Sequence, residues 1–268
     1  MNIFESMLLG LVEGLTEYLP VSSTGHLLVT QHLLGTGGDE AGNAYAVIIQ
    51  AGAILAVLGL YRERVQRAVM GVLGKDPEGR DFARDLIVAF LPAVVIGGLF
   101  NKAIERVLFG LWPVAIAWIV GGAAILGARN WLNRPGGEPL ESLGWRRALV
   151  VGVMQCLAMW PGTSRSLCTI VGGRLMGLAL PAAVEFSFLL GVMTLGAATA
   201  LKLVTNGKML VASYGLLNLG LGLAVAWLAA VVSVKWMVGW LQTHGMGVFG
   251  WWRLGAGLAV VAMLLARG

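Results

Sequence analysis

Long apolar segments are the feature of this sequence that most constrains its fold. Six of them approach or exceed the roughly 20 residues that a helix needs to cross a bilayer. They are Ala44–Tyr61, Leu86–Phe100, Trp112–Leu126, Val184–Val204, Leu216–Trp240 and Phe249–Ala266. The composition agrees, since only 12% of the residues are charged, whereas soluble domains carry about 25%. The sequence therefore predicts an all-α integral membrane protein with six transmembrane helices.

Two further apolar regions are interrupted by proline and polar residues. Met1–Leu34 contains Pro20, and Leu149–Leu175 contains Pro161 followed by Gly-Thr-Ser-Arg-Ser. Each region predicts two helices that are too short to cross the hydrocarbon core. We therefore expect each region to form a re-entrant helical hairpin, which enters the membrane and returns to the same side.

Basic residues in the connections predict the orientation in the membrane. Segments 62–84 and 129–147 are rich in Arg, while 101–111 carries only two basic residues. Short basic loops face the cytoplasm, so the first two should be cytoplasmic and the third should lie outside. The first hairpin then lies on the outer side, and the second enters from the cytoplasmic side. The basic residues form no aromatic-interleaved patch, so no nucleic-acid partner is expected.

The two interrupted regions also resemble each other. The residues around Glu13 match those around Gln155 at an offset of 142, and Ser23 matches Ser164 at an offset of 141. Each half then holds three crossings, and an odd number inverts the second copy relative to the first, as in many transporters. The predicted organisation is a single membrane domain, residues 1–268, with inverted repeats of roughly 1–128 and 145–268.

The first interruption concentrates ionisable and hydroxyl side chains in apolar sequence. Glu13 and Glu17 share one helix face. They could hold a divalent cation such as Mg²⁺ or Ca²⁺, or act as a general base and its orienting partner. His26 could activate a hydroxyl, protonate a leaving group or become phosphorylated. Three hydroxyl residues at the start of a helix offer caps and an anion site; they are Ser22, Ser23 and Thr24.

The second interruption supplies a cation. Thr163, Ser164 and Arg165 stand at a helix start, where N–H groups, hydroxyls and a bidentate guanidinium can bind phosphate. In apolar surroundings Arg165 needs an anionic partner, either a carboxylate of the first cluster or a substrate phosphate. Together the clusters suit phosphoryl transfer on a substrate with a phosphate head and an apolar tail. Arg253, which follows two tryptophans, has the pattern of an interfacial anchor.

The two motifs resemble the signatures of the undecaprenyl-diphosphate phosphatase, or bacitracin-resistance, family. Residues 13–26 read Glu-Gly-Leu-Thr-Glu-Tyr-Leu-Pro-Val-Ser-Ser-Thr-Gly-His, and residues 161–166 read Pro-Gly-Thr-Ser-Arg-Ser. The resemblance covers essentially the whole chain. It implies a bacterial inner-membrane enzyme, with its active site facing the periplasm, that hydrolyses undecaprenyl diphosphate to undecaprenyl phosphate and phosphate. This reaction recycles the lipid carrier for peptidoglycan synthesis and confers bacitracin resistance. Leu167 departs from the family pattern, which usually has glycine there.

The resemblance carries functional roles onto Glu13, Glu17, Ser22, Ser23, Thr24, His26, Ser164 and Arg165. In the favoured scheme Ser23 attacks the terminal phosphorus, His26 is its base or the leaving-group acid, and Arg165 binds the diphosphate. A competing scheme makes His26 the nucleophile or uses activated water. A lipid-phosphate transporter or flippase is the alternative from another functional class. No organic cofactor is expected; the partners are the polyprenyl diphosphate lipid and membrane lipid, and a homodimer is one possible assembly.

Overall fold

The computed structural model describes residues 1–37 and 40–267. Within these ranges the regular elements are helices, apart from an isolated bridge between Glu138 and Leu178. The α-helices are α1 (Ile3–Thr16), α2 (Ser23–Leu34), α3 (Glu40–Leu60), α4 (Arg62–Val72), α5 (Pro77–Leu108), α6 (Leu111–Gly127), α7 (Arg129–Leu132), α8 (Gly144–Gln155), α9 (Arg165–Leu175), α10 (Leu180–Leu241) and α11 (Gly247–Arg267). Two 3₁₀ turns are η1 (Leu140–Ser142) and η2 (Cys156–Met159). The prediction of an all-α protein is confirmed.

Five of the described helices are long and apolar enough to cross a membrane. Four of them, α3, α5, α6 and α11, each contain one predicted span, and α10 contains the other two. A straight helix of 62 residues, at about 1.5 Å per residue, would far exceed a hydrocarbon core of about 30 Å. Gly215 leaves helical geometry, with φ 73° and ψ 157°. Leu210 and Leu219 on its two sides pack in one apolar cluster, so α10 turns back there.

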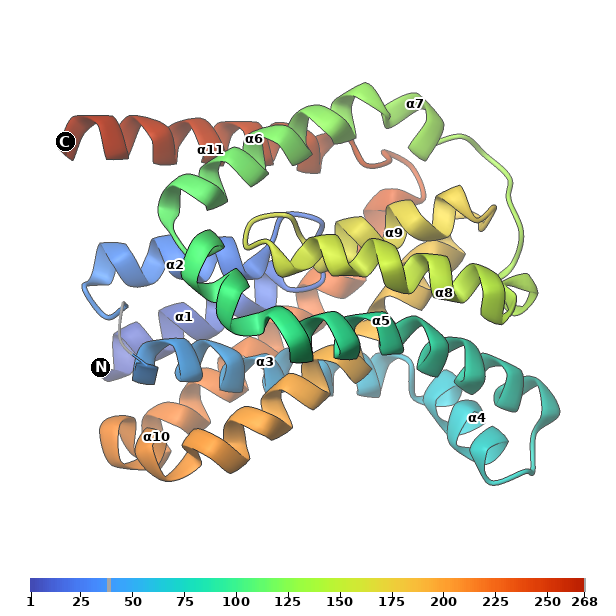
Figure 1. The fold of residues 1–268 in the computed structure, drawn as a ribbon, viewed down its shortest axis with the longest axis horizontal. Coiled ribbons are helices and arrows are strands. Elements are labelled where there is room, and N and C mark those ends of the chain that lie inside the picture. The colour runs from blue at the N-terminus through green and yellow to red at the C-terminus, as the bar shows by residue number, and fades with distance from the viewer. Residues whose placement is uncertain (38–39, 268) are drawn as a thin grey trace.

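Both interrupted regions form helical hairpins. Helix α1 packs against α2, and α8 with η2 packs against α9. Figure 1 shows the two hairpins running from opposite ends of the molecule, with their turns near its centre. Pro20 lies in the first turn and Pro161 in the second, where the missing N–H and the fixed φ of proline prevent a continuous helix.

Small residues let α1 and α3 approach α10 closely. A Cβ atom on Gly14 would stand 2.2 Å from the carbonyl oxygen of Ala226, and one on Gly52 would stand 2.4 Å from that of Leu223. Such small-residue contacts are how helices pack where lipid replaces water. Ser233 of α10 also donates a hydrogen bond to the Gly14 carbonyl at 2.9 Å. Helix α10 therefore supports both α3 and the first hairpin.

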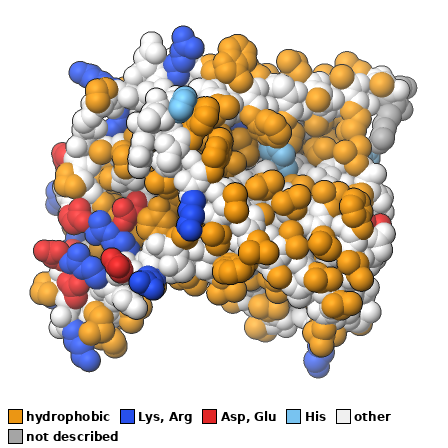
Figure 2. Space-filling model, turned by 180° about the vertical axis from the view of Figure 1, so that it is seen from behind, with side chains coloured by type: hydrophobic (Ala, Val, Ile, Leu, Met, Phe, Trp, Pro, Cys, Tyr) orange, Lys and Arg blue, Asp and Glu red, His pale blue; other side chains and the backbone are white. Residues whose placement is uncertain are grey.

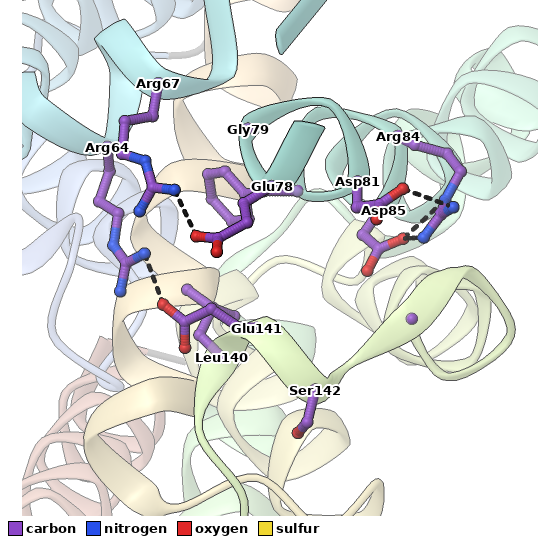
Figure 3. Close-up of a pocket in the computed structure, with 12 residues that line it drawn as sticks. Arg64, Arg67, Glu78, Gly79, Asp81, Arg84, Asp85, Leu140, Glu141 and Ser142 are labelled. Carbon is purple, nitrogen blue, oxygen red and sulfur yellow. Dashed lines mark hydrogen bonds and ion pairs between the residues drawn. The ribbon is translucent and has the colours of Figure 1, made fainter. Parts of the chain in front are cut away.

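Charged side chains gather at one end of the molecule. Figure 2 shows many of them at the lower left of the view, while hydrophobic side chains cover much of the remaining face. Arg64 of α4 binds Glu141 of η1 and Glu185 of α10, each at 2.6 Å. Figure 3 shows Arg64 and Glu141 at a cavity of about 170 Å³. The two basic segments, 62–84 and 129–147, therefore lie together, as their predicted location on one membrane face requires.

Candidate functional site

The turns of the two hairpins touch in the interior of the protein. Arg165 Nη2 donates to Glu17 Oε1 at 3.0 Å, although the two residues are 148 positions apart. Ser166 Oγ donates to the carbonyl of Leu19 at 2.8 Å. The Arg165 guanidinium carbon also lies 5.4 Å from the centroid of the Tyr18 ring. These contacts join the two sequence clusters into one site, and Glu17 supplies one of the two anionic partners that the sequence leaves open for Arg165, a carboxylate of the first cluster.

The same cap geometry opens the helix after each turn. Ser22 caps α2 and accepts the N–H of Gly25 at 3.4 Å, while Ser164 caps α9 and accepts that of Leu167 at 3.3 Å. Among the described non-glycine residues, these two serines have a left-handed φ, 72° and 78°. The cap role aligns Ser22, and not Ser23, with Ser164. The sequence alignment erred here because it matched the prolines, which stand at different places in the two turns.

Glu17 holds the hydroxyl and the cation of the site together. The Ser23 hydroxyl donates to Glu17 Oε2, and the Arg165 guanidinium donates to Oε1. Arg165 Nη1 also donates to the carbonyl of Ser187 at 2.8 Å. The side chains of Glu17 and Arg165 are only 4% and 11% exposed, so their attraction is weakly screened by water. This arrangement places the Ser23 hydroxyl beside a proton acceptor and close to a cation.

A cavity of about 320 Å³ opens on this group. Its polar and charged lining includes Glu17, Ser22, Ser23, Thr24, Ser164 and Arg165. Apolar side chains from α5, α10 and the segment between α5 and α6 also line it, among them Ala93, Phe109 and Leu195. A cavity that combines anion-binding groups with apolar walls suits the head of an amphipathic phosphate ester.

Three predicted site residues, Glu13, Thr163 and His26, lie outside the described lining of this cavity. His26 uses both ring nitrogens elsewhere. Its Nδ1 binds the Ser22 carbonyl at 2.8 Å, and its Nε2 accepts the indole N–H of Trp252 at 2.9 Å. The His26 ring thus links the Ser22 turn to α11. Glu17, and not His26, accepts the hydrogen bond of the Ser23 hydroxyl.

Glu13 is fully buried, and neither of its carboxylate oxygens has a hydrogen-bond partner among the described residues. It interacts with Glu17, one helical turn away. Mg²⁺ and Ca²⁺ bind carboxylate oxygens, so Glu13, with Glu17 beside it, has the chemistry of a ligand for such an ion. Within the described ranges, no three His, Cys, Asp or Glu side chains assemble into a metal-binding group. Further ligands would therefore have to be other oxygen atoms, such as those of a phosphate.

Sequence reasoning missed the place of Arg253, which is fully buried, so its prediction as an interfacial anchor is wrong. Nη1 donates to the carbonyls of Pro20 and Thr163 at 3.3 and 3.1 Å. Nη2 donates to those of Ala117 and Gly162, both at 2.8 Å. One guanidinium from α11 therefore clamps both turns. The adjacent tryptophans hid this role, because aromatic residues beside a cation are typical of the membrane interface.

Leu167, the departure from the second family signature, occupies a helical position. It lies in the first turn of α9 and packs in the main apolar cluster with 7% of its surface exposed. The positive-φ residues of this turn are Gly162 and Ser164, so position 167 does not need the conformational freedom of glycine. The leucine therefore contributes apolar contact at an ordinary helical position.

Comparison with known proteins shows the family of the chain. Residues 6–259 match the sequence model of the family described as "Bacitracin resistance protein BacA". "Undecaprenyl-diphosphatase" of Sorangium cellulosum (strain So ce56) is 46% identical over 262 residues, which cover 96% of this chain and 85% of the relative. "Undecaprenyl-diphosphatase 3" of Acinetobacter baylyi is 42% identical, with 98% of both chains covered. "Undecaprenyl-diphosphatase" of Paracoccus denitrificans is 43% identical over 99% of this chain and 98% of its own. The chain belongs to the BacA bacitracin-resistance family.

Proposed function

We propose that this protein is an undecaprenyl-diphosphatase, an integral membrane phosphatase that hydrolyses undecaprenyl diphosphate to undecaprenyl phosphate and phosphate. The observation that carries the proposal is the buried group of Glu17, Ser23 and Arg165 where the two turns meet. Full-length relatives that bear this enzyme name support it. The product lipid re-enters cell-wall synthesis, in keeping with the bacitracin resistance in the family description.

In the proposed mechanism, Arg165 binds non-bridging oxygens of the diphosphate in place of part of its contact with Glu17. Ser23 Oγ attacks the terminal phosphorus and passes its proton to the Glu17 carboxylate, to which it is already hydrogen-bonded. The bond from that phosphorus to the bridging oxygen breaks, and undecaprenyl phosphate leaves with the electron pair. Once Glu17 has lost its proton to solvent, it activates a water that cleaves the Ser23 phosphoester and releases phosphate.

Hydroxyl groups and helix N-termini around the cavity support phosphate binding during this reaction. Ser22, Thr24 and Ser164 line the cavity beside the attacking group, where their hydroxyls could donate to phosphate oxygens. The N-termini of α2 and α9 carry the positive ends of their helix dipoles. We propose these groups, with Thr163 through its turn, as the phosphate-binding part of the site.

A divalent cation is the further component we propose for this site. Glu13 and Glu17 would hold it, and when bound it would neutralise charge on the diphosphate. We expect EDTA to reduce turnover and Mg²⁺ or Ca²⁺ to restore it. Glu13→Gln should raise the concentration of the cation needed for half-maximal restoration. Full turnover in EDTA would remove the cation from the proposal.

The nucleophile is tested by comparing Ser23→Ala with His26→Ala in single-turnover assays of purified protein. The contact between Ser23 and Glu17 leads us to expect loss of phosphate release in Ser23→Ala. His26→Ala should retain chemistry at a reduced rate, because its ring braces the Ser22 turn. Full activity of Ser23→Ala would exclude the serine scheme and favour His26 or activated water as the nucleophile.

Phosphate release from undecaprenyl diphosphate in detergent also separates the enzyme from the transporter alternative. A pure lipid-phosphate flippase moves the lipid without breaking its phosphoanhydride bond, so it would release no phosphate in this assay. Measurable release by the wild-type protein, absent from Glu17→Gln and Arg165→Ala, is the expected result.

Light scattering on the same sample tests the proposed homodimer.

For the membrane arrangement we propose two re-entrant hairpins in inverted repeats of roughly 1–128 and 145–268, with the site facing the periplasm. The opposed hairpins in Figure 1 and the shared cap geometry of Ser22 and Ser164 support the repeat. The orientation rests on the basic segments 62–84 and 129–147, which are expected in the cytoplasm. Single cysteines introduced at exposed positions of these segments should react with an impermeant maleimide only after the inner membrane is opened.

A further inference from the structure

Gln155 is a buried glutamine whose side-chain amide makes no hydrogen bond within the part of the chain that the structure describes. It is the last residue of α8 and only 4% exposed. Neither Oε1 nor Nε2 has a hydrogen-bond partner among the described residues. Burying an amide without a hydrogen bond costs free energy. Such a group persists in a native structure when something outside the chain satisfies it.

The position of Gln155 indicates what that partner is. Gln155 lines the same cavity as Glu17, Ser23 and Arg165. Several described side chains have a buried polar atom without a partner, and of these residues Gln155 and Arg165 line this cavity; the unpartnered atom of Arg165 is Nε. Two residues in the wall of this cavity therefore carry N–H groups without a described partner, and the hydroxyl proposed as the nucleophile belongs to the same wall.

The repeat sharpens the assignment. Gln155 stands where the first hairpin has Glu13, at the offset of 142. A carboxylate accepts hydrogen bonds and repels an anion, whereas an amide N–H donates to an anion without adding charge. The amide thus lies on the hairpin that also carries Arg165, the cationic half of the site.

We propose that Gln155 is a substrate-binding residue, whose amide Nε2 donates a hydrogen bond to a phosphoryl oxygen of the lipid diphosphate. This inference rests on the proposed function and adds a residue to it. Together with the Arg165 guanidinium, the amide would fix the diphosphate so that its terminal phosphorus faces Ser23 Oγ.

Gln155→Met tests the inference, because methionine keeps the approximate length and volume of glutamine and removes its polar atoms. We expect kcat/KM for undecaprenyl diphosphate to fall about 10- to 100-fold, the range for a lost hydrogen bond to a charged group. The thermal midpoint should stay the same or rise, because an unsatisfied buried amide is removed. Gln155→Glu should lose more activity than Gln155→Met, because its carboxylate repels the diphosphate.

Gln31 provides the matched control. It is also a buried glutamine, 2% exposed, but its Nε2 donates to the Gly42 carbonyl at 2.8 Å. Gln31→Met should therefore lower the thermal midpoint and leave kcat/KM within about twofold of the wild type. Wild-type kcat/KM in Gln155→Met, or a fall of its thermal midpoint as large as that of Gln31→Met, would overturn the inference.

Inorganic pyrophosphate separates this inference from the proposed function. It should raise the thermal midpoint of the wild-type protein by binding to the folded site, and by clearly less in Gln155→Met. If the wild type released no phosphate from the lipid but kept this difference in shift, the proposed function would fail while the anion contact of Gln155 stood. Equal shifts in the two proteins would overturn the inference even if the wild type were an active enzyme.

Discussion

At the scale of single residues, the role of Arg165 depends more on the geometry of its guanidinium than on its charge. Arg165 uses two separate nitrogens, one for Glu17 and one for the Ser187 carbonyl, at 3.0 and 2.8 Å. A lysine ammonium is a single point of charge and cannot reproduce this planar fork. Arg165→Lys should therefore lower kcat/KM about 100-fold, or about 2.7 kcal/mol, as measured by phosphate release.

Arg174, at the other end of α9, is the control for that substitution. It donates to the carbonyls of Leu178 and Arg134, both at 2.8 Å, away from the cavity lining. Arg174→Lys should lower the thermal midpoint and keep kcat/KM within about threefold. Equal losses of activity in both lysine variants would show that the loss reflects α9 as a whole and not phosphate binding by Arg165.

Arg253 is a second single residue on which the site depends, and its described hydrogen bonds all go to backbone carbonyls. Its removal would leave the carbonyls of both turns without their cationic donor, and hydrogen bonds to charged groups contribute about 1.5–3 kcal/mol each. Arg253→Met should destabilise the protein by about 3 kcal/mol or more and lower kcat, with Arg253→Lys intermediate in both. Thermal unfolding in detergent measures the first effect. A methionine variant as stable as the wild type would contradict the clamp.

At the scale of helices, close approach between α3 and α10 fixes the scaffold behind the site. Gly52→Ala places a methyl group 2.4 Å from the Leu223 carbonyl oxygen, and such overpacking costs about 1–3 kcal/mol. Gly59, on the same helix, has open space around its Cβ position. Gly59→Ala should be neutral or stabilising by up to about 1 kcal/mol, since alanine favours helix more than glycine does. Thermal midpoints that fall equally in both variants would show that the close contact of Gly52 with α10 is not the cause of the loss.

The elements also show what the sequence could and could not predict. Apolar length alone predicted the membrane helices, because the length criterion depends on composition and not on tertiary contacts. It could not predict that Gly215 is the residue at which α10 turns back, since a single glycine in an apolar run gives no sign of the φ it adopts. The motifs predicted that Glu17, Ser23 and Arg165 share a site. They could not assign His26 or Arg253, whose partners come from the distant helices α6 and α11 and from the other turn.

At the scale of the whole molecule, the charged end connects α4, η1 and α10 through Arg64. A backbone N–H and the Arg64 side chain lower the pKa of Glu141. A carboxyl group with a lowered pKa adds stability above its unfolded-state pKa of about 4.3, and this stability is lost as the pH falls through the folded-state pKa. The pair is partly exposed, so its contribution should be small, about 0.2–1 kcal/mol.

Glu141→Gln tests this dependence. The difference in thermal midpoint between the wild type and Glu141→Gln should be constant from about pH 5 to 8 and shrink below about pH 4. Catalysis should not change, because Glu141 lies at the charged end and not in the lining of the site cavity. A difference that grew as the pH fell would reverse the expected sign and exclude the Arg64 contact as its source.

The clamp from α11 sets the order in which the protein can become active. Both hairpin turns are synthesised before Arg253 leaves the ribosome, yet the carbonyls of both turns depend on that one side chain. A nascent chain that has inserted every earlier helix would still lack the side chain that binds the carbonyls of both turns. The protein should therefore become active only after α11 has been inserted, so incompletely translated chains in the membrane would not hydrolyse the lipid.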